Sequence, residues 1–157
     1  MSNKLARFLA ICALVVALAI SSIPAMAQSF TTFVVPGAAA TLPLSINPAG
    51  EITGWYYDGS AFHGFVRAGS GAITKFDPPG SRVTFVSSIN PAGAVTGYYG
   101  AGSGLHGFVR AAGGAITAFD VPGSVSTLPV SINPAGAITG YYNDRSVFHG
   151  FVREPHH

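Results

Sequence analysis

The chain has 157 residues, of which 48% are hydrophobic and only 9% are charged. This balance excludes a charged disordered tail and a coiled coil, because both need far more charge than this chain carries. The length is that of one modest domain, and the formal net charge is only +2.

The first 27 residues predict a secretory signal peptide. Lys4 and Arg7 supply its positive start, an apolar run follows over 8–20, and Ala25-Met26-Ala27 supplies the small residues that a signal peptidase accepts. The apolar run is shorter than the roughly 20 residues of a membrane-spanning helix. We therefore expect cleavage after Ala27, a secreted or periplasmic protein, and no association with a membrane after cleavage.

Removal of the signal peptide changes the charge of the chain. Residues 28–157 hold six basic and six acidic side chains, so their formal net charge is zero. A nucleic-acid-binding protein needs a basic patch to replace phosphate counterions, so this charge balance excludes nucleic acid as a partner. The single cysteine, Cys12, falls inside the signal peptide. Disulfides are therefore not expected to stabilise the exported protein.

Residues 28–157 form a repeat domain in which one sequence unit occurs three times. Two motifs recur, both at a spacing of 43 residues. Ser-Ile-Asn-Pro-Ala-Gly begins at Ser45, Ser88 and Ser131, and His-Gly-Phe-Val-Arg begins at His63, His106 and His149. A fixed period of this length is typical of propellers and other internally symmetric folds. The units cover approximately 33–75, 76–118 and 119–157.

Over the length of one unit, the sequence predicts short β-strands joined by turns. In chain order, β-prone runs cover 73–76, 84–89, 94–99 and 105–110. Asp-Pro-Pro-Gly closes the first run and Asn-Pro-Ala-Gly the second, and both are turn sequences because proline presets φ and glycine relieves the turn exit. None of the runs has the 3.6-residue period of a helix. Each unit is therefore predicted to be a four-stranded antiparallel meander.

The two ends of the repeat domain complement each other in sequence. The third copy of the motif stops at Arg153, where Glu-Pro-His-His replaces the expected last strand, and 29–33 resembles that strand. We expect 29–33 to complete the last unit, because propellers use such closure to hide open sheet edges.

The repeated Ile-Asn-Pro-Ala-Gly-x-x-Thr-Gly-Tyr-Tyr, followed by His-Gly-Phe-Val-Arg, resembles the bacterial HAF-type extracellular repeat. That family has Ile-Asn-x-x-Gly-x-x-x-Gly before a His-Ala-Phe motif, whereas Gly64, Gly107 and Gly150 stand at the alanine position here. The resemblance covers 33–153 and implies an exported β-propeller-like protein. It implies no catalytic residues, because the family is defined by its repeats and not by an activity.

Three units leave two all-β architectures open. Propellers ordinarily have at least four blades, so three blade-like units would need more, and a homodimer would supply six. The alternative is a β-trefoil-like single domain, which builds three four-stranded units into one three-fold body. The family resemblance favours blades, while the length of the chain fits a trefoil well.

The polar residues of the motifs also recur, whereas a catalytic constellation is normally singular. We therefore expect His63, His106 and His149 to be hydrogen-bonded structural side chains. The alternative is that symmetry brings the three imidazoles to one axis, where they would form a zinc-like site.

Aspartates and arginines recur beside these histidines. Asp77 and Asp120 lie in Asp-x-Pro-Gly sequences, which predict turns in which the carboxylate caps its own backbone. We expect Arg67, Arg110 and Arg153 to pair with these carboxylates or with backbone carbonyls. The alternative is that the two aspartates are the paired acids of a glycosidase. The turn context favours the structural role, so we predict no catalytic residue, no metal and no cofactor.

Pairs of aromatic residues occupy equivalent positions in the three units. A tyrosine directly follows each of Trp55, Tyr98 and Tyr141. Adjacent strand residues point to opposite faces of a sheet. These rings are expected either to pack between units or to form shallow platforms for sugar rings. The polar loops that follow them differ among the copies, as expected where specificity lies.

The sequence thus predicts an exported, non-catalytic repeat protein that acts as an extracellular binding or structural module. A neutral extracellular glycan is the expected ligand, bound by Trp55, Tyr98 and Tyr141, since a net charge of zero fits no strongly charged ligand. The alternative from another class is a hydrolase that acts on extracellular polysaccharide.

Overall fold

The structure is a computed structural model that describes residues 28–155. The predicted signal peptide, 1–27, lies outside the described residues. A compact unit begins at Phe33, and the chain carries no strand from 28 to 39. From there to 155 the secondary structure consists of eleven strands without a helix. The predicted all-β fold class is therefore confirmed.

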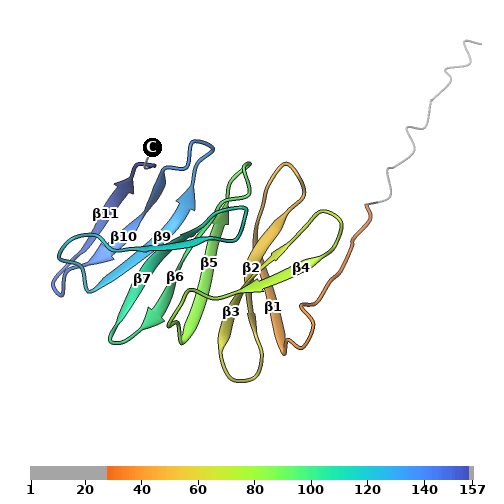
Figure 1. Ribbon diagram of the computed structural model, residues 1–157, viewed down its shortest axis with the longest axis horizontal. Coiled ribbons are helices and arrows are strands. Elements are labelled where there is room, and N and C mark those ends of the chain that lie inside the picture. Colours follow the sequence, from red (N-terminus) through yellow and green to blue (C-terminus); the bar gives the residue numbers. More distant parts are fainter. Residues whose placement is uncertain (1–27, 156–157) are drawn as a thin grey trace, which may run out of the picture. The chain divides into compact units, whose positions relative to one another are not determined.

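The first two copies of the repeat each form a meander of four antiparallel strands (Figure 1). Unit I consists of β1 (Ala40–Ile46), β2 (Ile52–Tyr57), β3 (Phe62–Arg67) and β4 (Ile73–Phe76). Unit II consists of β5 (Val83–Ile89), β6 (Val95–Ala101), β7 (Gly104–Arg110) and β8 (Ile116–Phe119). In both units the strands pair in chain order, as the sequence predicts.

The third copy, unit III, contributes three strands to the described part of the chain. These are β9 (Ser126–Ile132), β10 (Ile138–Asn143) and β11 (Phe148–Arg153), and β10 pairs with both of the others. One parallel residue pair, Leu105 with Ser126, joins β9 to β7, so units II and III share a seven-stranded sheet. Residues 29–33 carry no strand, so the completion of unit III by this segment stays a prediction.

The Asn-Pro-Ala-Gly turns close the first hairpin of each unit. The Oδ1 of Asn47 accepts hydrogen bonds from the N–H of Ala49 (3.1 Å) and of Glu51 (3.0 Å). Glycine ends the turn because the backbone there has a positive φ, 75° at Gly50, which other residues rarely adopt. Corresponding side-chain contacts recur in units II and III.

The same asparagines connect one unit to the next. The Nδ2 of Asn47 donates to the carbonyl of Asn90, and the Nδ2 of Asn90 donates to the carbonyl of Asn133, both at 3.2 Å. We call this series the asparagine ladder. Asn47 and Asn90 are buried, whereas Asn133, at its end, is exposed.

Consecutive units pack face to face, so the core lies between them. β5 packs against β1, β2 and β3, and β9 packs against β5 and β6. At the first junction, the fully buried Phe108 belongs to a cluster that includes Val66 and Phe76 of unit I. A second cluster joins Val35, which precedes β1, to the fully buried Phe65. Burial of these apolar side chains is the main stabilising contribution available to a chain of this composition.

A phenylalanine that precedes each unit packs edge-on against the phenylalanine of that unit's His-Gly-Phe-Val-Arg strand. The ring pairs and their centroid distances are Phe33–Phe65 at 6.1 Å, Phe76–Phe108 at 6.0 Å and Phe119–Phe151 at 6.2 Å. The arginine of the motif lies over the first ring of each pair, at 4.7 to 5.0 Å. Edge-to-face aromatic contacts and cation–π contacts thus join each unit to the segment before it.

These contacts correct the predicted arginine–aspartate pairs. Arg67 and Arg110 donate to the backbone carbonyls of Ala68 and Ala111. Pairing with carbonyls was the alternative that the sequence left open. Within residues 28–155 every ion pair joins a histidine to an aspartate. The physical reason is that the ring of the preceding phenylalanine occupies the face of the guanidinium.

Candidate functional site

Aromatic side chains from all three units line one surface, which we call the aromatic row. Its members lie on β2, β3, β5, β6, β10 and β11: Trp55, Phe62, Phe85, Tyr98, Tyr141 and Phe148. The next residue along the strand points to the opposite face, so Tyr56 and Tyr99 are buried, at 6% and 9% exposure. The alternation expected from the sequence is therefore present.

The structure places the three predicted platform residues in different surroundings. Trp55 packs edge-on against Phe62 and against Phe85 of the next unit, at centroid distances of 5.2 and 5.6 Å. Tyr98 packs against Phe85 at 5.3 Å, and burial, together with the nearby Tyr141, raises its pKa. Tyr141 is 41% exposed. Packing between units thus accounts for Trp55, and packing on Phe85 within unit II accounts for Tyr98, whereas Tyr141 stays exposed.

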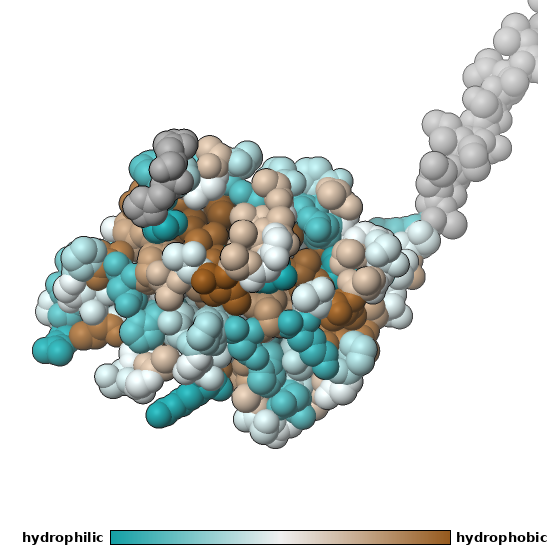
Figure 2. All heavy atoms as spheres, in the orientation of Figure 1, coloured by the Kyte–Doolittle hydropathy of each residue, from teal (hydrophilic) through white to brown (hydrophobic). Residues whose placement is uncertain are grey.

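Tyr141 borders a hollow of about 380 Å³ at the junction of units II and III. The other lining residues are Leu105, Ser126, Leu128, Asn143 and Phe148. Two leucines form an apolar wall, two rings stand nearly perpendicular with centroids 5.8 Å apart, and a hydroxyl and an amide supply polar groups. Figure 2 shows apolar side chains in several separate patches among polar ones on one face of the molecule.

Sequence reasoning identified Tyr141 and missed the other residues of the hollow. The signal that would have found Leu128 is cross-strand register, because Tyr141 pairs with Leu128 in the β9–β10 ladder. Phe148 occupies the same repeat position as Phe62, which contacts Trp55. Leu105 occupies that position in unit II.

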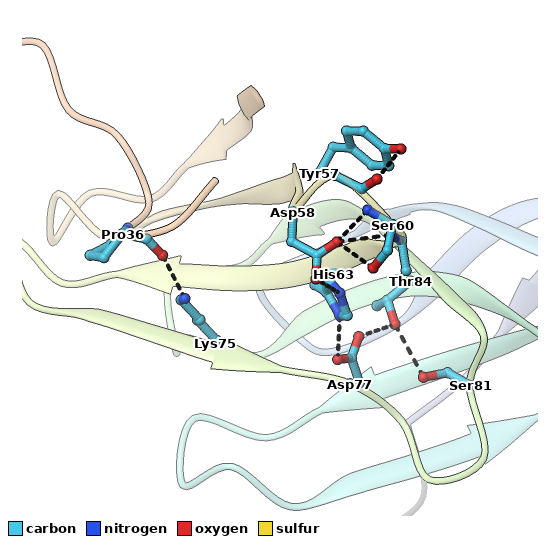
Figure 3. A network of polar contacts seen from close by, with 11 residues as sticks. Pro36, Tyr57, Asp58, Ser60, His63, Lys75, Asp77, Ser81 and Thr84 are labelled. Atoms are coloured by element: carbon cyan, nitrogen blue, oxygen red, sulfur yellow. Dashed lines mark hydrogen bonds and ion pairs between the residues drawn. The ribbon is translucent and has the colours of Figure 1, made fainter. Parts of the chain in front are cut away.

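The repeated histidines take part in hydrogen bonds with aspartates (Figure 3). In unit I, the Nδ1 of His63 lies 2.7 Å from Asp77 Oδ2 and the Nε2 lies 3.2 Å from Asp58 Oδ2. Thr84 of β5 donates to the other oxygen of Asp77 at 2.5 Å, and the imidazole stacks on Tyr56. This network ties the loop after β2 to the connection between units I and II.

The other two units hold their histidines in a related way. His106 lies 2.8 Å from Asp120, and His149 lies 3.0 Å from Asp144. The predicted hydrogen-bonded histidines are therefore confirmed. Among the described residues, no group of three or more His, Cys, Asp or Glu side chains could hold a metal ion, so the zinc-like alternative finds no support.

The predicted role of the turn aspartates was wrong. Asp77 and Asp120 bond to histidines and do not cap their own turns. In unit III the turn N–H of Val121 donates instead to Thr127 Oγ1, at 3.1 Å. Thr84, seven residues after Asp77, instead donates to that carboxylate, because Pro78 offers no N–H for it to accept.

The loop aspartates Asp58 and Asp144 have pKa values well below the ordinary one. The N–H of Ala61 makes the largest contribution at Asp58, and the hydroxyl of Ser146 does so at Asp144. The general acid of a glycosidase needs a raised pKa so that it is protonated when it acts. These two carboxylates are therefore suited to holding their loops and not to donating a proton.

We predict that Asp120→Asn lowers the pKa of His106. The hydrogen bond that the carboxylate of Asp120 accepts from Nδ1 of His106, helped by the charge of Asp120, outweighs burial and raises this pKa above its ordinary value. A raised pKa in the folded state stabilises the fold below the unfolded pKa of about 6.5, and this stability is lost as the pH rises through the folded value. As the pH rises above about 6.5, the free energy of unfolding of the variant should therefore fall less than that of the wild type.

The measurement is an NMR titration of the imidazole signals, followed by thermal unfolding across the same pH range. His149 is the internal control, because its aspartate partner is Asp144. An unchanged His106 titration in the variant would contradict the assignment of Asp120 as its partner.

Neither a scan against protein-family models nor a search of curated proteins finds a match for this chain. The described residues include no helix with the length and apolar character needed to cross a membrane.

Proposed function

We propose that this chain is an exported, non-catalytic binding module of the bacterial HAF-repeat type, secreted or periplasmic, whose ligand is a neutral extracellular glycan. The observation that carries the proposal is the hollow beside Tyr141. It is lined without a charged side chain, and its two rings are the most exposed members of the aromatic row, at 41% for Tyr141 and 66% for Phe148.

The chemistry of the hollow suits a sugar ring. A pyranose has apolar C–H faces that pack on aromatic rings, and hydroxyls at its rim that need hydrogen-bonding partners. Tyr141 and Phe148 would supply the packing, while Ser126 and Asn143 would supply partners for the hydroxyls. Trp55 and Tyr98 would extend the row along which a longer glycan could lie, each adding a weaker contact.

The arrangement of the units supports blades over a trefoil-like body. Consecutive meanders pack face to face. In the described part of the chain, strands of different units share one residue pair in a ladder, Leu105 with Ser126. Apart from this one pair, the units join through their faces, as the blades of a propeller do.

The test is retention of the purified protein in gels that contain neutral polysaccharides. We expect Tyr141→Ala to weaken retention about tenfold, the equivalent of about 1.4 kcal/mol, and to leave the melting temperature nearly unchanged because the ring is exposed. Trp55→Ala is the matched control, and it should lower the melting temperature because its ring packs between units.

Two results would contradict the proposal. One is a wild-type protein that no neutral polysaccharide retains. The other is a Tyr141→Ala variant that is retained as well as the wild type. The same polysaccharides, incubated with the protein and assayed for new reducing ends, also test the hydrolase alternative, since release of sugar would show catalysis.

A further inference from the structure

Gly150 lies on β11, at the edge of the sheet. No aromatic ring lies over it, unlike the glycines at the same position in units I and II. Gly64 and Gly107 are buried, because the ring of Phe76 lies over the first and the ring of Phe119 over the second. A Cβ built on either glycine would lie 2.7 or 2.9 Å from that ring. Gly150 occupies the same position in unit III, and the nearest atom to its Cβ would be a backbone oxygen 4.0 Å away.

The covering phenylalanine ends the fourth strand of its unit. Phe76 pairs with Gly64 in the β3–β4 ladder, and Phe119 pairs with Gly107 in the β7–β8 ladder. The chain has a third segment with this pattern, because Phe30-Thr31-Thr32-Phe33 aligns at 43-residue spacing with the residues of β4 and β8. Its last residue, Phe33, already packs on the following unit as Phe76 does.

The exposed apolar side chains at the two ends of the repeat array match the contacts of an internal junction. Ile46 of unit I is 66% exposed, whereas Ile89 and Ile132 at the same repeat position are each 6% exposed. Val152 of unit III is 68% exposed, whereas Val66 is partly buried against the core of unit II. Unit I thus presents the face that receives a preceding unit, and unit III presents the face that receives a following one.

The asparagine ladder also indicates that a further unit could follow unit III. Each step joins the side chain of one unit to the backbone of the next, and the exposed Asn133 is the next donor in this order. A further unit I placed after unit III would offer the carbonyl of Asn47 to it.

We propose that residues 30–33 of a second copy of this chain pair with β11 as the fourth strand of unit III, so that its Phe33 covers Gly150. Copies then associate head to tail, with unit III of one copy packed on unit I of the next. The register follows the two existing ladders: Thr31 lies opposite Val152, as Thr74 lies opposite Val66 and Thr117 opposite Val109. Two copies that close on each other form the expected homodimer of six units.

This assembly goes beyond glycan binding and does not require it. Strand addition satisfies the backbone groups of an open sheet edge and buries the apolar side chains of both faces. Gly150 and Thr31 lie outside the lining of the hollow. Variants at these two positions therefore test the assembly without altering the glycan site, and a failure of one proposal does not imply failure of the other.

The first experiment tests the register with a cysteine pair. Thr31→Cys and Val152→Cys are combined with Cys12→Ala, so that the two new thiols are the only ones in the chain. Residues opposite each other in an antiparallel pair have Cα atoms about 4.5–5.5 Å apart, which a disulfide can bridge. Light and 15N-labelled chains are mixed in denaturant, refolded together and oxidised. The control pair, Ser29→Cys with Val152→Cys, is displaced by two residues.

We expect cross-linked peptides that join a light chain to a heavy chain, formed by the first pair and much less by the control pair. Cross-links confined to chains of one isotope would show closure within a single chain and overturn the exchange between copies. Equal cross-linking by the two pairs, or none by either, would overturn the register.

The second experiment is sedimentation of the full chain at micromolar concentration. The wild type should sediment as two or more chains. Gly150→Ala should sediment as a single chain with an unchanged circular dichroism spectrum, because its Cβ has room in one copy but collides with the Phe33 ring of the next. A single-chain wild type, or a Gly150→Ala variant that still associates, would overturn the proposal.

Discussion

Replacing Phe108 by alanine is expected to lower the free energy of unfolding by about 3–5 kcal/mol, the range for truncation of a buried phenylalanine. Its side chain is fully buried and lies at the junction of units I and II. The ring contacts Phe76 of the preceding unit and Tyr99 of its own. The cavity would therefore open at the interface that holds two repeat units together, where neither backbone can collapse without losing strand pairing.

Phe148→Ala is the matched control for this variant, because the same residue type is 66% exposed in unit III. Urea denaturation of both variants measures the difference directly. If Phe108→Ala and Phe148→Ala cost the same, the core does not lie between the units.

Gly97→Ala is expected to cost about 3 kcal/mol, at the upper end of the range for overpacking. A Cβ at this position would overlap the carbonyl oxygen of Phe85 and lie 2.8 Å from the Cα of Val86. Both atoms belong to the backbone of β5, where the β5–β6 register shifts between Val86 and Ser88. The backbone would have to move, because a side chain cannot swing away to make room.

The corresponding glycines of the other units, Gly54 and Gly140, would meet carbonyl oxygens in the same way. The glycine of the Thr-Gly dipeptide that precedes the aromatic pair is thus required by close approach of two strands in every unit. Gly113→Ala serves as the control, since a Cβ there has no neighbour within 4 Å. A Gly97→Ala variant as stable as Gly113→Ala would show that the strands are further apart than the structure places them.

The local features of the fold could be predicted from the sequence because short patterns carry them. Asn47 with the following proline and glycine specifies a turn whatever surrounds it, since the contacts that hold it span only four residues. The strand-length apolar runs and the 43-residue period likewise predict the meanders of units I and II. The hydrogen-bonded role of His63 followed from its recurrence.

The partners of these side chains could not be predicted in the same way. Arg67 and Asp77 have opposite charges and recur together in sequence, which suggested an ion pair. The structure instead places Phe33 against Arg67 and His63 against Asp77. Such choices depend on strand register and on which face of a strand meets the neighbouring unit, and neither is encoded in a short segment.

By itself, the sequence determined that this protein is all-β, built from repeated antiparallel meanders, and that Trp55, Tyr98 and Tyr141 occupy equivalent positions. Only the tertiary structure decided that these positions are not equivalent physically. Trp55 has a following unit that packs against it, whereas Tyr141 belongs to the last unit described and stays exposed beside a hollow. The physical reason is that a repeat specifies the same side chain in every unit, while exposure is set by the neighbour that packs on it.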